Sequence, residues 1–198
     1  MLKANFITAQ EAAEKIQDGS TLCTIGMTLV SASESILKAI EKRFETVGHP
    51  ADITLVHSCG QSDRKDGIQH LAHEGLVKRI IGSHWGLQPR WMEMIANSQV
   101  EAYCLPQGQI AQLYRSMACG LPGKMSKVGL GTFIDPRVEG GKMNDRTKPL
   151  PDIVDILEYS GEEYMFYKEI PLDTVLIRGT VCDEMGNLTT TEEAMKLE

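Results

Sequence analysis

The residues Thr21-Leu-Cys-Thr-Ile25 open the part of the sequence that decides the fold. They form a short run of β-branched and apolar residues that stops at Gly26, and residues 33–44 then place Ile, Leu and Phe at helical spacing. A second apolar run, Ile53-Thr-Leu-Val-His57, follows. A strand, a helix and another strand in this order predict two parallel strands joined by a right-handed helical crossover.

The same alternation continues as far as residue 118. We expect helices over 8–17, where Thr8-x-x-Glu11 forms a capping box, and over 69–78, 89–96 and 110–118. We expect further strands over 79–81 and 100–104. Because the strands are apolar throughout rather than alternating, the sequence predicts an α/β fold with a mainly parallel sheet layered with helices on both faces.

The pattern changes after residue 121, where glycine and proline become frequent. Strands are expected over 153–157, 163–167 and 174–178, and the first two are predicted to form an antiparallel hairpin around Ser160-Gly161. A second capping box, Thr190-x-x-Glu193, predicts a terminal helix. No repeat or linker divides the chain, so we expect a single domain over residues 1–198 that is truncated at its carboxyl end.

Composition excludes several classes of protein and partner. The 198 residues carry 27 acidic and 20 basic side chains, a net charge of -7, and no cluster of basic residues that would bind nucleic acid. The amino terminus lacks the apolar run of a signal peptide, and the longest mostly apolar stretch, residues 22–30, is too short to span a bilayer. Five scattered cysteines indicate no disulfide framework. We expect a cytoplasmic protein with no nucleic-acid or membrane partner.

Three glycine-bearing loops are candidates for binding a substrate. Gly26 ends the first predicted strand, and Leu105-Pro-Gln-Gly108, with Gln107 and Gly108, follows a later one. Ligands of open α/β sheets bind beyond the carboxyl ends of the strands. Gly129 and Gly131 begin a third loop that contains Arg137 and has the glycine content of an anion-binding loop, although an ordinary surface loop has the same composition.

A metal site is not favoured by the sequence. His70-x-x-His73 places two imidazoles three residues apart on a predicted helix, and His84 follows ten residues later. No zinc-protease, nucleotide-binding or serine-hydrolase motif accompanies them. We therefore interpret these residues as ordinary core or solvated histidines and predict no metal.

Several short segments resemble the family I coenzyme A transferases, in the acetate/propionate branch that carries both halves on one polypeptide. The resemblance covers essentially the whole chain. The segments that carry the resemblance are Ala72-His-Glu-Gly-Leu-Val-Lys78, Gly82-Ser-His-Trp85, Pro106-Gln-Gly108, Val128-Gly-Leu-Gly-Thr-Phe-Ile-Asp-Pro-Arg137, Gly140-Gly-Lys-Met-Asn144, Leu176-Ile-Arg-Gly-Thr180 and Asp183-Glu-Met-Gly-Asn187. The first-strand loop keeps Asp18, Gly19 and Gly26 of the family pattern but has Ile25, Met27, Ser31 and Ser33 at its other positions.

This resemblance implies the fold shared by CoA-transferases, ribose-phosphate isomerases and glucosamine-phosphate deaminases. It also implies ping-pong transfer of coenzyme A from an acyl-CoA to a short-chain carboxylate through a glutamyl-CoA thioester. Coenzyme A is then a substrate, and no cofactor is needed. The family's nucleophilic glutamate belongs to a carboxyl-terminal half that this chain does not match, so no catalytic residue is assigned.

The resemblance places the side chain of Gln107 at the active site, with Gly108, Gly26, Gly129 and Gly131 as further substrate-binding candidates. The implied partners are an acyl-CoA, a carboxylate and the missing carboxyl-terminal half, and an unpaired apolar face predicts a homo-oligomer. A noncatalytic subunit or assembly module that keeps the fold is the main alternative. A sugar-phosphate isomerase is a weaker one, because the sequence shows no phosphate loop and no acid-base pair.

Overall fold

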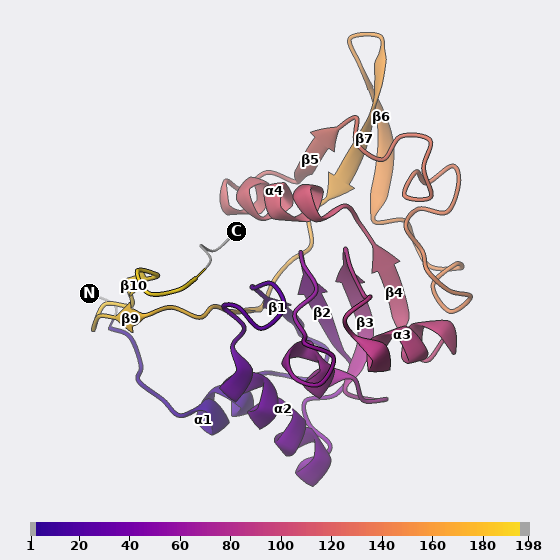
Figure 1. The fold of residues 1–198 in the computed structure, drawn as a ribbon. Coiled ribbons are helices and arrows are strands. Elements are labelled where there is room, and N and C mark those ends of the chain that lie inside the picture. The colour runs from indigo at the N-terminus through magenta and orange to yellow at the C-terminus, as the bar shows by residue number, and fades with distance from the viewer. Residues whose placement is uncertain (1–2, 195–198) are drawn as a thin grey trace.

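A computed structural model of the chain describes residues 3–194, and its centre is a five-stranded parallel sheet (Figure 1). The strands lie in the order β4-β3-β2-β1-β8. Their bounds are Thr21–Thr24 for β1, Ile53–His57 for β2, Val77–Gly82 for β3, Glu101–Cys104 for β4 and Thr174–Leu176 for β8. Every neighbouring pair is parallel, which confirms the predicted sheet.

Residues alternate along these strands between two apolar cores. Leu22 of β1, Leu55 of β2 and Ile80 of β3 pack with helices on one face of the sheet, and the next residues, Cys23, Val56 and Ile81, belong to a second core on the other face. The helices of the first face are α1 (Ala9–Glu14), α2 (Glu34–Val47), the 3-10 helix η1 (Gly67–Leu71) and α3 (Pro89–Ala96). Burial on both faces explains why the strands are continuously apolar.

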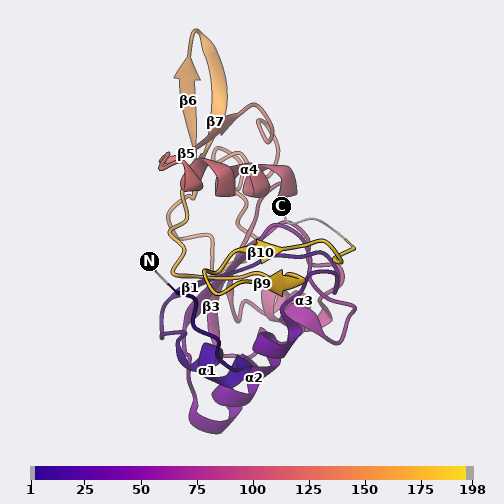
Figure 2. The same ribbon diagram turned by 90° about the vertical axis from the view of Figure 1, so that its left-hand side faces the viewer.

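The second face is covered by α4 (Gln107–Ala118) and a separate antiparallel sheet. This sheet has the order β5-β7-β6, with β5 at Gly123–Ser126, β6 at Val154–Tyr159 and β7 at Glu162–Lys168. The β6–β7 hairpin turns at Ser160 and Gly161, which both have positive φ angles, as a two-residue hairpin turn requires. Figure 2 shows this hairpin projecting away from the parallel sheet. The hairpin predicted around these two residues is confirmed.

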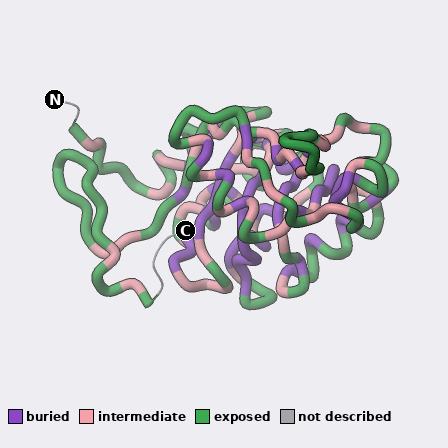
Figure 3. Tube along the Cα trace, turned by 90° about the horizontal axis from the view of Figure 1, so that it is seen from above, coloured by how far each residue is buried: buried purple, intermediate pink, exposed green. Residues whose placement is uncertain are grey.

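The last described part of the chain forms an exposed arm. Strands β9 (Val181–Cys182) and β10 (Leu188–Thr189) make a small antiparallel ribbon, and the Ala4 amide donates to the Glu184 carbonyl at 2.9 Å. Figure 3 shows almost no buried residues in this arm. Residues 190–194 contain no helix, so the predicted start of the terminal helix is wrong, and residues 195–198 lie outside the described chain.

Two other predicted helices need correction, and one strand is additional to the predicted elements. The helix predicted over 69–78 is only η1, because Gly75 has a φ of 88° and Val77 already pairs with Ile53 as the first residue of β3. The helix predicted over 110–118 begins earlier, at Gln107. Strand β5 was not predicted, since its partner β7 lies about forty residues further along the chain.

No helix within residues 3–194 combines the length and the apolar character needed to cross a bilayer. Within the described residues, none of the five cysteines, Cys23, Cys59, Cys104, Cys119 and Cys182, forms a disulfide bond.

Candidate functional site

The carboxyl ends of the five parallel strands meet along one edge, which we call the carboxyl edge (Figure 1). The loop after β1, residues 25–33, is the β1 loop. Gly26 has a φ of 142°, and a side chain there would place its Cβ 2.8 Å from the Val30 carbonyl oxygen. Only glycine fits this position, because both the backbone conformation and the close approach exclude a larger residue.

The β1 loop is tied to the loop after β2, residues 58–66, which we call the β2 loop. The Thr28 amide donates to the Gly60 carbonyl at 2.9 Å, and the Gln61 side chain donates to the Thr24 carbonyl at 2.7 Å. Thr28 and Ser31 both have positive φ angles without being glycine. Strained backbone of this kind persists only where surrounding contacts hold it, so the two loops form one supported unit at the carboxyl edge.

Gln107 and Gly108 lie at the opposite end of the same edge. Pro106 follows β4 and caps α4, so Gln107 and Gly108 form the first turn of that helix and are exposed. The predicted loop is therefore shorter than expected and consists of Leu105 and Pro106. Three strand spacings separate β1 from β4, about 14 Å, so only an extended ligand contacts both Gly26 and Gln107.

A layer of buried polar side chains lies beneath these loops. Thr24, His57 and Gly82 are neighbours at the ends of β1, β2 and β3. The His57 ring is fully buried and meets Trp85 edge-on at 4.6 Å between ring centroids. A Cβ on Gly82 would lie 2.6 Å from the His57 ring, so this glycine makes the room for it. Sequence reasoning missed this layer, although a histidine at a core-facing strand position was its signal.

Burial determines the charge of His57. Removal from water lowers the pKa of His57 to about 4, and only a backbone contact at Cys59 opposes this shift. His57 is therefore a neutral polar group below the β1 and β2 loops at physiological pH.

The glycines of the third predicted loop lie in a different environment. The Gly129 backbone passes Tyr167, whose hydroxyl donates to the Val128 carbonyl at 2.6 Å. The Gly131 amide donates to the Asp135 carboxylate at 2.9 Å. Residues 127–138, the Asp135 loop, thus pack on β7, and the structure does not bring Gly129 and Gly131 into the strand-end loops with Gly26.

Asp135 organises that loop. Its carboxylate is almost completely buried and accepts hydrogen bonds from the amide and the guanidinium of Arg137, and this guanidinium also binds Glu163. The Arg137 side chain holds the pKa of Asp135 well below its ordinary value, against the opposing effect of burial. Arg137 is therefore already paired with two carboxylates, which differs from the anion-binding charge expected from the sequence.

An apolar pocket of about 350 Å³ adjoins the β1 loop, between β1, β8 and α4. Its lining consists of Cys23, Ile25, Tyr114, Met117, Ala118, Leu172, Val175 and Ile177. Strand β8 pairs only with β1 within the described residues, and Val175 and Ile177 are about half exposed. The surface beside Gly26 is thus apolar and open at the edge strand.

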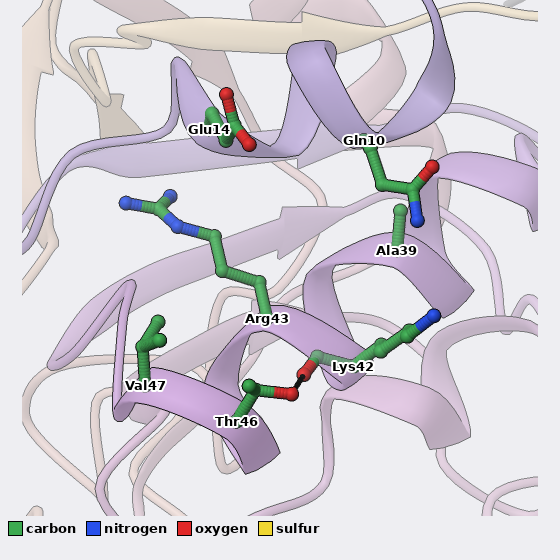
Figure 4. A pocket seen from close by; sticks show the side chains of 7 residues that line it. All are labelled: Gln10, Glu14, Ala39, Lys42, Arg43, Thr46 and Val47. Carbon is green, nitrogen blue, oxygen red and sulfur yellow. Dashed lines mark hydrogen bonds between the residues drawn. The ribbon is translucent and has the colours of Figure 1, made fainter.

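A second pocket, of about 370 Å³, lies between α1 and α2 (Figure 4). Its central charged residue, Arg43, donates to the Ala13 carbonyl at 2.7 Å and to the Ile16 carbonyl at 2.9 Å. These contacts satisfy carbonyl groups at the end of α1. The pocket lies on the helical side of the molecule, away from the carboxyl edge, and its arginine has a structural role.

Two groups of side chains have the geometry to hold a cation. Glu34, Asp66 and His70 form one group, and Glu41, Glu45 and His73 form the other, each with ligand atoms within 4.8 Å of one another. The ammonium group of Lys38 contacts Glu34 at 3.0 Å and Asp66 at 3.2 Å. Lys38 therefore supplies the positive charge in the first group, and Arg90 lies 3.6 Å from Glu41 of the second, so we assign neither group as metal ligands.

Comparison with known proteins gives a consistent result over the whole chain. The coenzyme A transferase family model matches residues 6–198. The caffeate CoA-transferase of Acetobacterium woodii is 43% identical over 187 residues, which cover 94% of this chain and 35% of that protein. The acetate CoA-transferase YdiF of Escherichia coli strain K12 is 38% identical over 194 residues, covering 97% and 36%.

A solved structure shares the fold in detail. The acyl-CoA transferase YdiF from E. coli O157:H7, in a thioester complex with CoA, superposes with a TM-score of 0.92 at 36% identity. The match covers 96% of this chain and 37% of that one. The present chain thus spans about a third of the length of the relatives that it matches.

Proposed function

The chain belongs to the coenzyme A transferase family, and from this premise we propose that its loops surround the reacting thioester in an acyl-CoA:carboxylate CoA-transferase. The family and the α/β fold expected from the sequence are thereby confirmed. The observation that supports the proposal is the match over residues 6–198 in a chain whose β1, β2 and β4 loops meet at one edge. Coenzyme A enters as the substrate, and the reaction needs no further cofactor.

The proposed reaction is a ping-pong exchange of the acetate/propionate type. A glutamate carboxylate attacks the thioester carbonyl, the C–S bond breaks, and coenzyme A leaves as a thiolate. The thiolate then attacks the glutamyl carbonyl of the resulting anhydride, which forms the glutamyl-CoA thioester and releases the first carboxylate. A second carboxylate repeats these steps in reverse. The glutamate comes from the carboxyl-terminal half, the part of the longer relatives that this chain does not match.

This chain contributes the surroundings of that reaction. The Gly26 backbone amide stabilises the oxyanion that forms at the carbonyl, because the neighbouring amides of Met27 and Thr28 already donate to the Val30 and Gly60 carbonyls. Gln107 and Gly108 bind the extended coenzyme A at the far end of the carboxyl edge. The backbone of Gly129 and Gly131 supports the Asp135 loop, which forms one side of the substrate site. Because His57 beneath the loops is neutral, it carries neither a positive charge that would attract water nor an imidazolium proton that would protonate the thiolate.

Binding of coenzyme A tests the proposal directly. Calorimetric titration of the purified chain with coenzyme A and acetyl-CoA is expected to show binding that Gly26→Val and Gln107→Ala weaken. Tyr159→Ala is the matched control, because Tyr159 is 65% exposed on the distal hairpin. The absence of binding by the unmodified chain, or equal weakening by the control, contradicts the proposed role of the carboxyl edge.

A second experiment tests where the glutamate lies. The purified chain, incubated with acetyl-CoA and propionate, is expected to show no exchange of coenzyme A between the acids. Exchange would place the nucleophile within these residues. The alternative of a noncatalytic assembly module predicts neither binding nor exchange, even after the carboxyl-terminal half is supplied. Homo-oligomerisation in the cytoplasm belongs to the same proposal, and sedimentation of a stable monomer at micromolar concentration contradicts it.

A second class of acid is a candidate for the acyl group of the substrate. The 43% identity to a caffeate CoA-transferase favours an aromatic acid beside the short-chain acids, and the apolar pocket next to Ile25 is consistent with either. Competition between acetate, propionate and caffeate for a single acyl-CoA donor, measured on the complete enzyme, distinguishes the two.

A further inference from the structure

One cluster of titratable side chains has no part in the proposed reaction. It lies where α2 meets the segment between β2 and β3. Glu34, Lys38 and Glu41 share one face of α2, and His70 of η1 lies against this face. The His70 side chain is only 13% exposed. The cluster is therefore partly shielded from water, and its charges interact more strongly than those of an exposed pair.

Both ring nitrogens of His70 face carboxylates. Nδ1 contacts Glu41 Oε2 at hydrogen-bonding distance, and Nε2 lies 2.9 Å from Glu34 Oε1 and 3.3 Å from Asp66 Oδ1. A neutral imidazole has one donor nitrogen and one acceptor nitrogen. Its acceptor nitrogen would then oppose a carboxylate oxygen with no hydrogen between them. The geometry therefore requires a proton on each nitrogen, which makes the ring an imidazolium.

The contacts of His70 continue to the candidate site. Glu34 also accepts a hydrogen bond from the Gly67 amide at 2.9 Å, and the Ile68 amide donates to the Gln61 carbonyl at 2.9 Å. The Gln61 side chain in turn holds the end of β1, and neighbouring Gly60 holds Thr28 of the β1 loop. A continuous series of hydrogen bonds thus joins α2, η1, the β2 loop and the β1 loop.

We propose that His70 is a positioning residue that, as a doubly protonated imidazolium, ties η1 to α2 and thereby holds the β1 and β2 loops in place at the carboxyl edge. The proposal rests on the proposed function only in that this edge receives coenzyme A. The other titratable or charged side chains that face the cluster are His73, Arg90 and Glu45. Lys38 contacts Glu34 and Asp66, whereas Arg90 lies 3.6 Å from Glu41.

The sign of the pH dependence follows from these contacts. Burial alone would lower the pKa of His70, but the hydrogen bonds to Glu41 and Glu34 outweigh it, so the pKa is raised. A raised folded-state pKa stabilises the fold fully below the ordinary histidine pKa of about 6.5. This contribution is lost as the pH rises through the folded-state value. The β1 and β2 loops are therefore held more tightly at pH 7 than at pH 9.

The protonation state is tested first on the unmodified chain. Long-range ¹H–¹⁵N spectra of the histidine side chains are expected to show both His70 nitrogens protonated at pH 7. His57 provides the internal contrast, because its ring is expected to be neutral at the same pH. A neutral His70 tautomer at pH 7 overturns the proposal.

Amide hydrogen exchange then tests the connection to the site. After correction for intrinsic exchange rates, protection of the Gly67, Ile68 and Thr28 amides is expected to fall about fivefold between pH 7 and pH 9, relative to the β6–β7 hairpin. In His70→Asn the protection is expected to be low at every pH. His73→Asn is the matched control, because His73 contacts Glu41 through one nitrogen only and needs no second proton.

The two proposals fail in different ways. Protection in His70→Asn equal to that of the unmodified chain, or a pH profile also lost in His73→Asn, overturns the role of His70. If the unmodified chain binds no coenzyme A while His70 is doubly protonated and the exchange profile is as expected, the proposed function fails and the positioning role of His70 is supported. If coenzyme A binds but its affinity is unchanged in His70→Asn, the effect on the carboxyl edge is contradicted.

Discussion

Two glycine-bearing loops of this chain differ in the groups that their backbone amides contact. In the Asp135 loop, the Gly131 and Arg137 amides both donate to the buried Asp135 carboxylate. In the β1 loop, which contains no carboxylate, the Met27 amide donates to the Val30 carbonyl and the Thr28 amide donates to the Gly60 carbonyl of the β2 loop. The first loop carries its own anion, whereas the second is supported by a neighbouring loop at the edge of the sheet.

This difference shows why glycine content alone does not identify a ligand-binding loop. Glycine permits a backbone to present its amides, but an internal carboxylate satisfies the same amides that an external anion would need. The partner of each amide decides between a structural loop and a binding loop. The Asp135 loop is therefore structural at its centre, and the β1 loop is the stronger candidate for contact with the thioester.

The largest predicted effect is on the Asp135 loop. Asp135→Ala removes a carboxylate that accepts hydrogen bonds from Gly131 and Arg137; the Gly131 amide loses this acceptor, and Arg137 keeps only its contacts with Glu163. We expect the free energy of unfolding to fall by about 3 kcal/mol, as for other broken buried ion pairs. Urea unfolding measures this change. A loss below about 0.5 kcal/mol, typical of surface substitutions, would show that the carboxylate does not organise the loop.

A pair of glycine substitutions compares the two loops directly. Gly26→Ala is expected to cost about 2 kcal/mol, because a φ of 142° and a carbonyl at 2.8 Å both oppose a Cβ. Gly131→Ala is expected to cost about 1 kcal/mol, since its φ of 69° is strained for alanine but the space around it is open. Equal costs in thermal unfolding would mean that the close approach at Gly26 is relieved by movement of the β1 loop.

The sequence predicted the parallel sheet because its signals are local. Pro89 begins α3 as a first-turn proline should, and Thr8 and Glu11 form both bonds of the predicted capping box. Features that depend on distant partners were not predicted. Strand β5 forms only because Gly123 lets the backbone approach Tyr167, and Val77 joins β3 rather than a helix because β2 lies beside it.

The candidate site residues also fall into two groups, those that a rule of topology located and those whose surroundings depend on distant contacts. Gly26, Gln107 and Gly108 were placed at strand ends by a rule of α/β topology, and the structure puts them at the carboxyl edge. Gly129 and Gly131 were selected for composition, which does not reveal that Asp135 folds back onto the loop. His57 was missed as a site residue, because its burial depends on three strands and on Trp85 together.

Acid is expected to affect the two loops differently. The pKa of His57 is lowered to about 4, so between pH 6.5 and pH 4 the unfolded chain binds a proton that the folded chain does not. Stability of the carboxyl edge therefore falls as the pH falls through this range. The pKa of Asp135 lies below its ordinary value, and its contribution is lost only at a still lower pH.

Amide exchange at pH 7 and pH 5 separates these responses. Protection of the amides around His57 and the β1 loop is expected to fall about tenfold at pH 5, while the Asp135 loop stays protected. His57→Phe is expected to abolish the change and to leave the Asp135 loop as it was. A parallel loss of protection in both loops would indicate a global acid effect and would contradict the local role of His57.

The smallest predicted effect concerns the far end of the carboxyl edge. Gln107→Ala is expected to weaken coenzyme A binding about fivefold, the size of one side-chain hydrogen bond, with no loss of stability because Gln107 is exposed at the start of α4. Gly108→Ala is the comparison at the other proposed binding residue: nothing lies within 4 Å of its Cβ position and alanine favours the helix, so this variant is expected to be stable and to weaken binding less than Gln107→Ala. Weaker binding in Gly108→Ala alone would place the ligand against the α4 backbone, which would assign recognition at this end of the edge to main-chain contacts and not to the Gln107 amide.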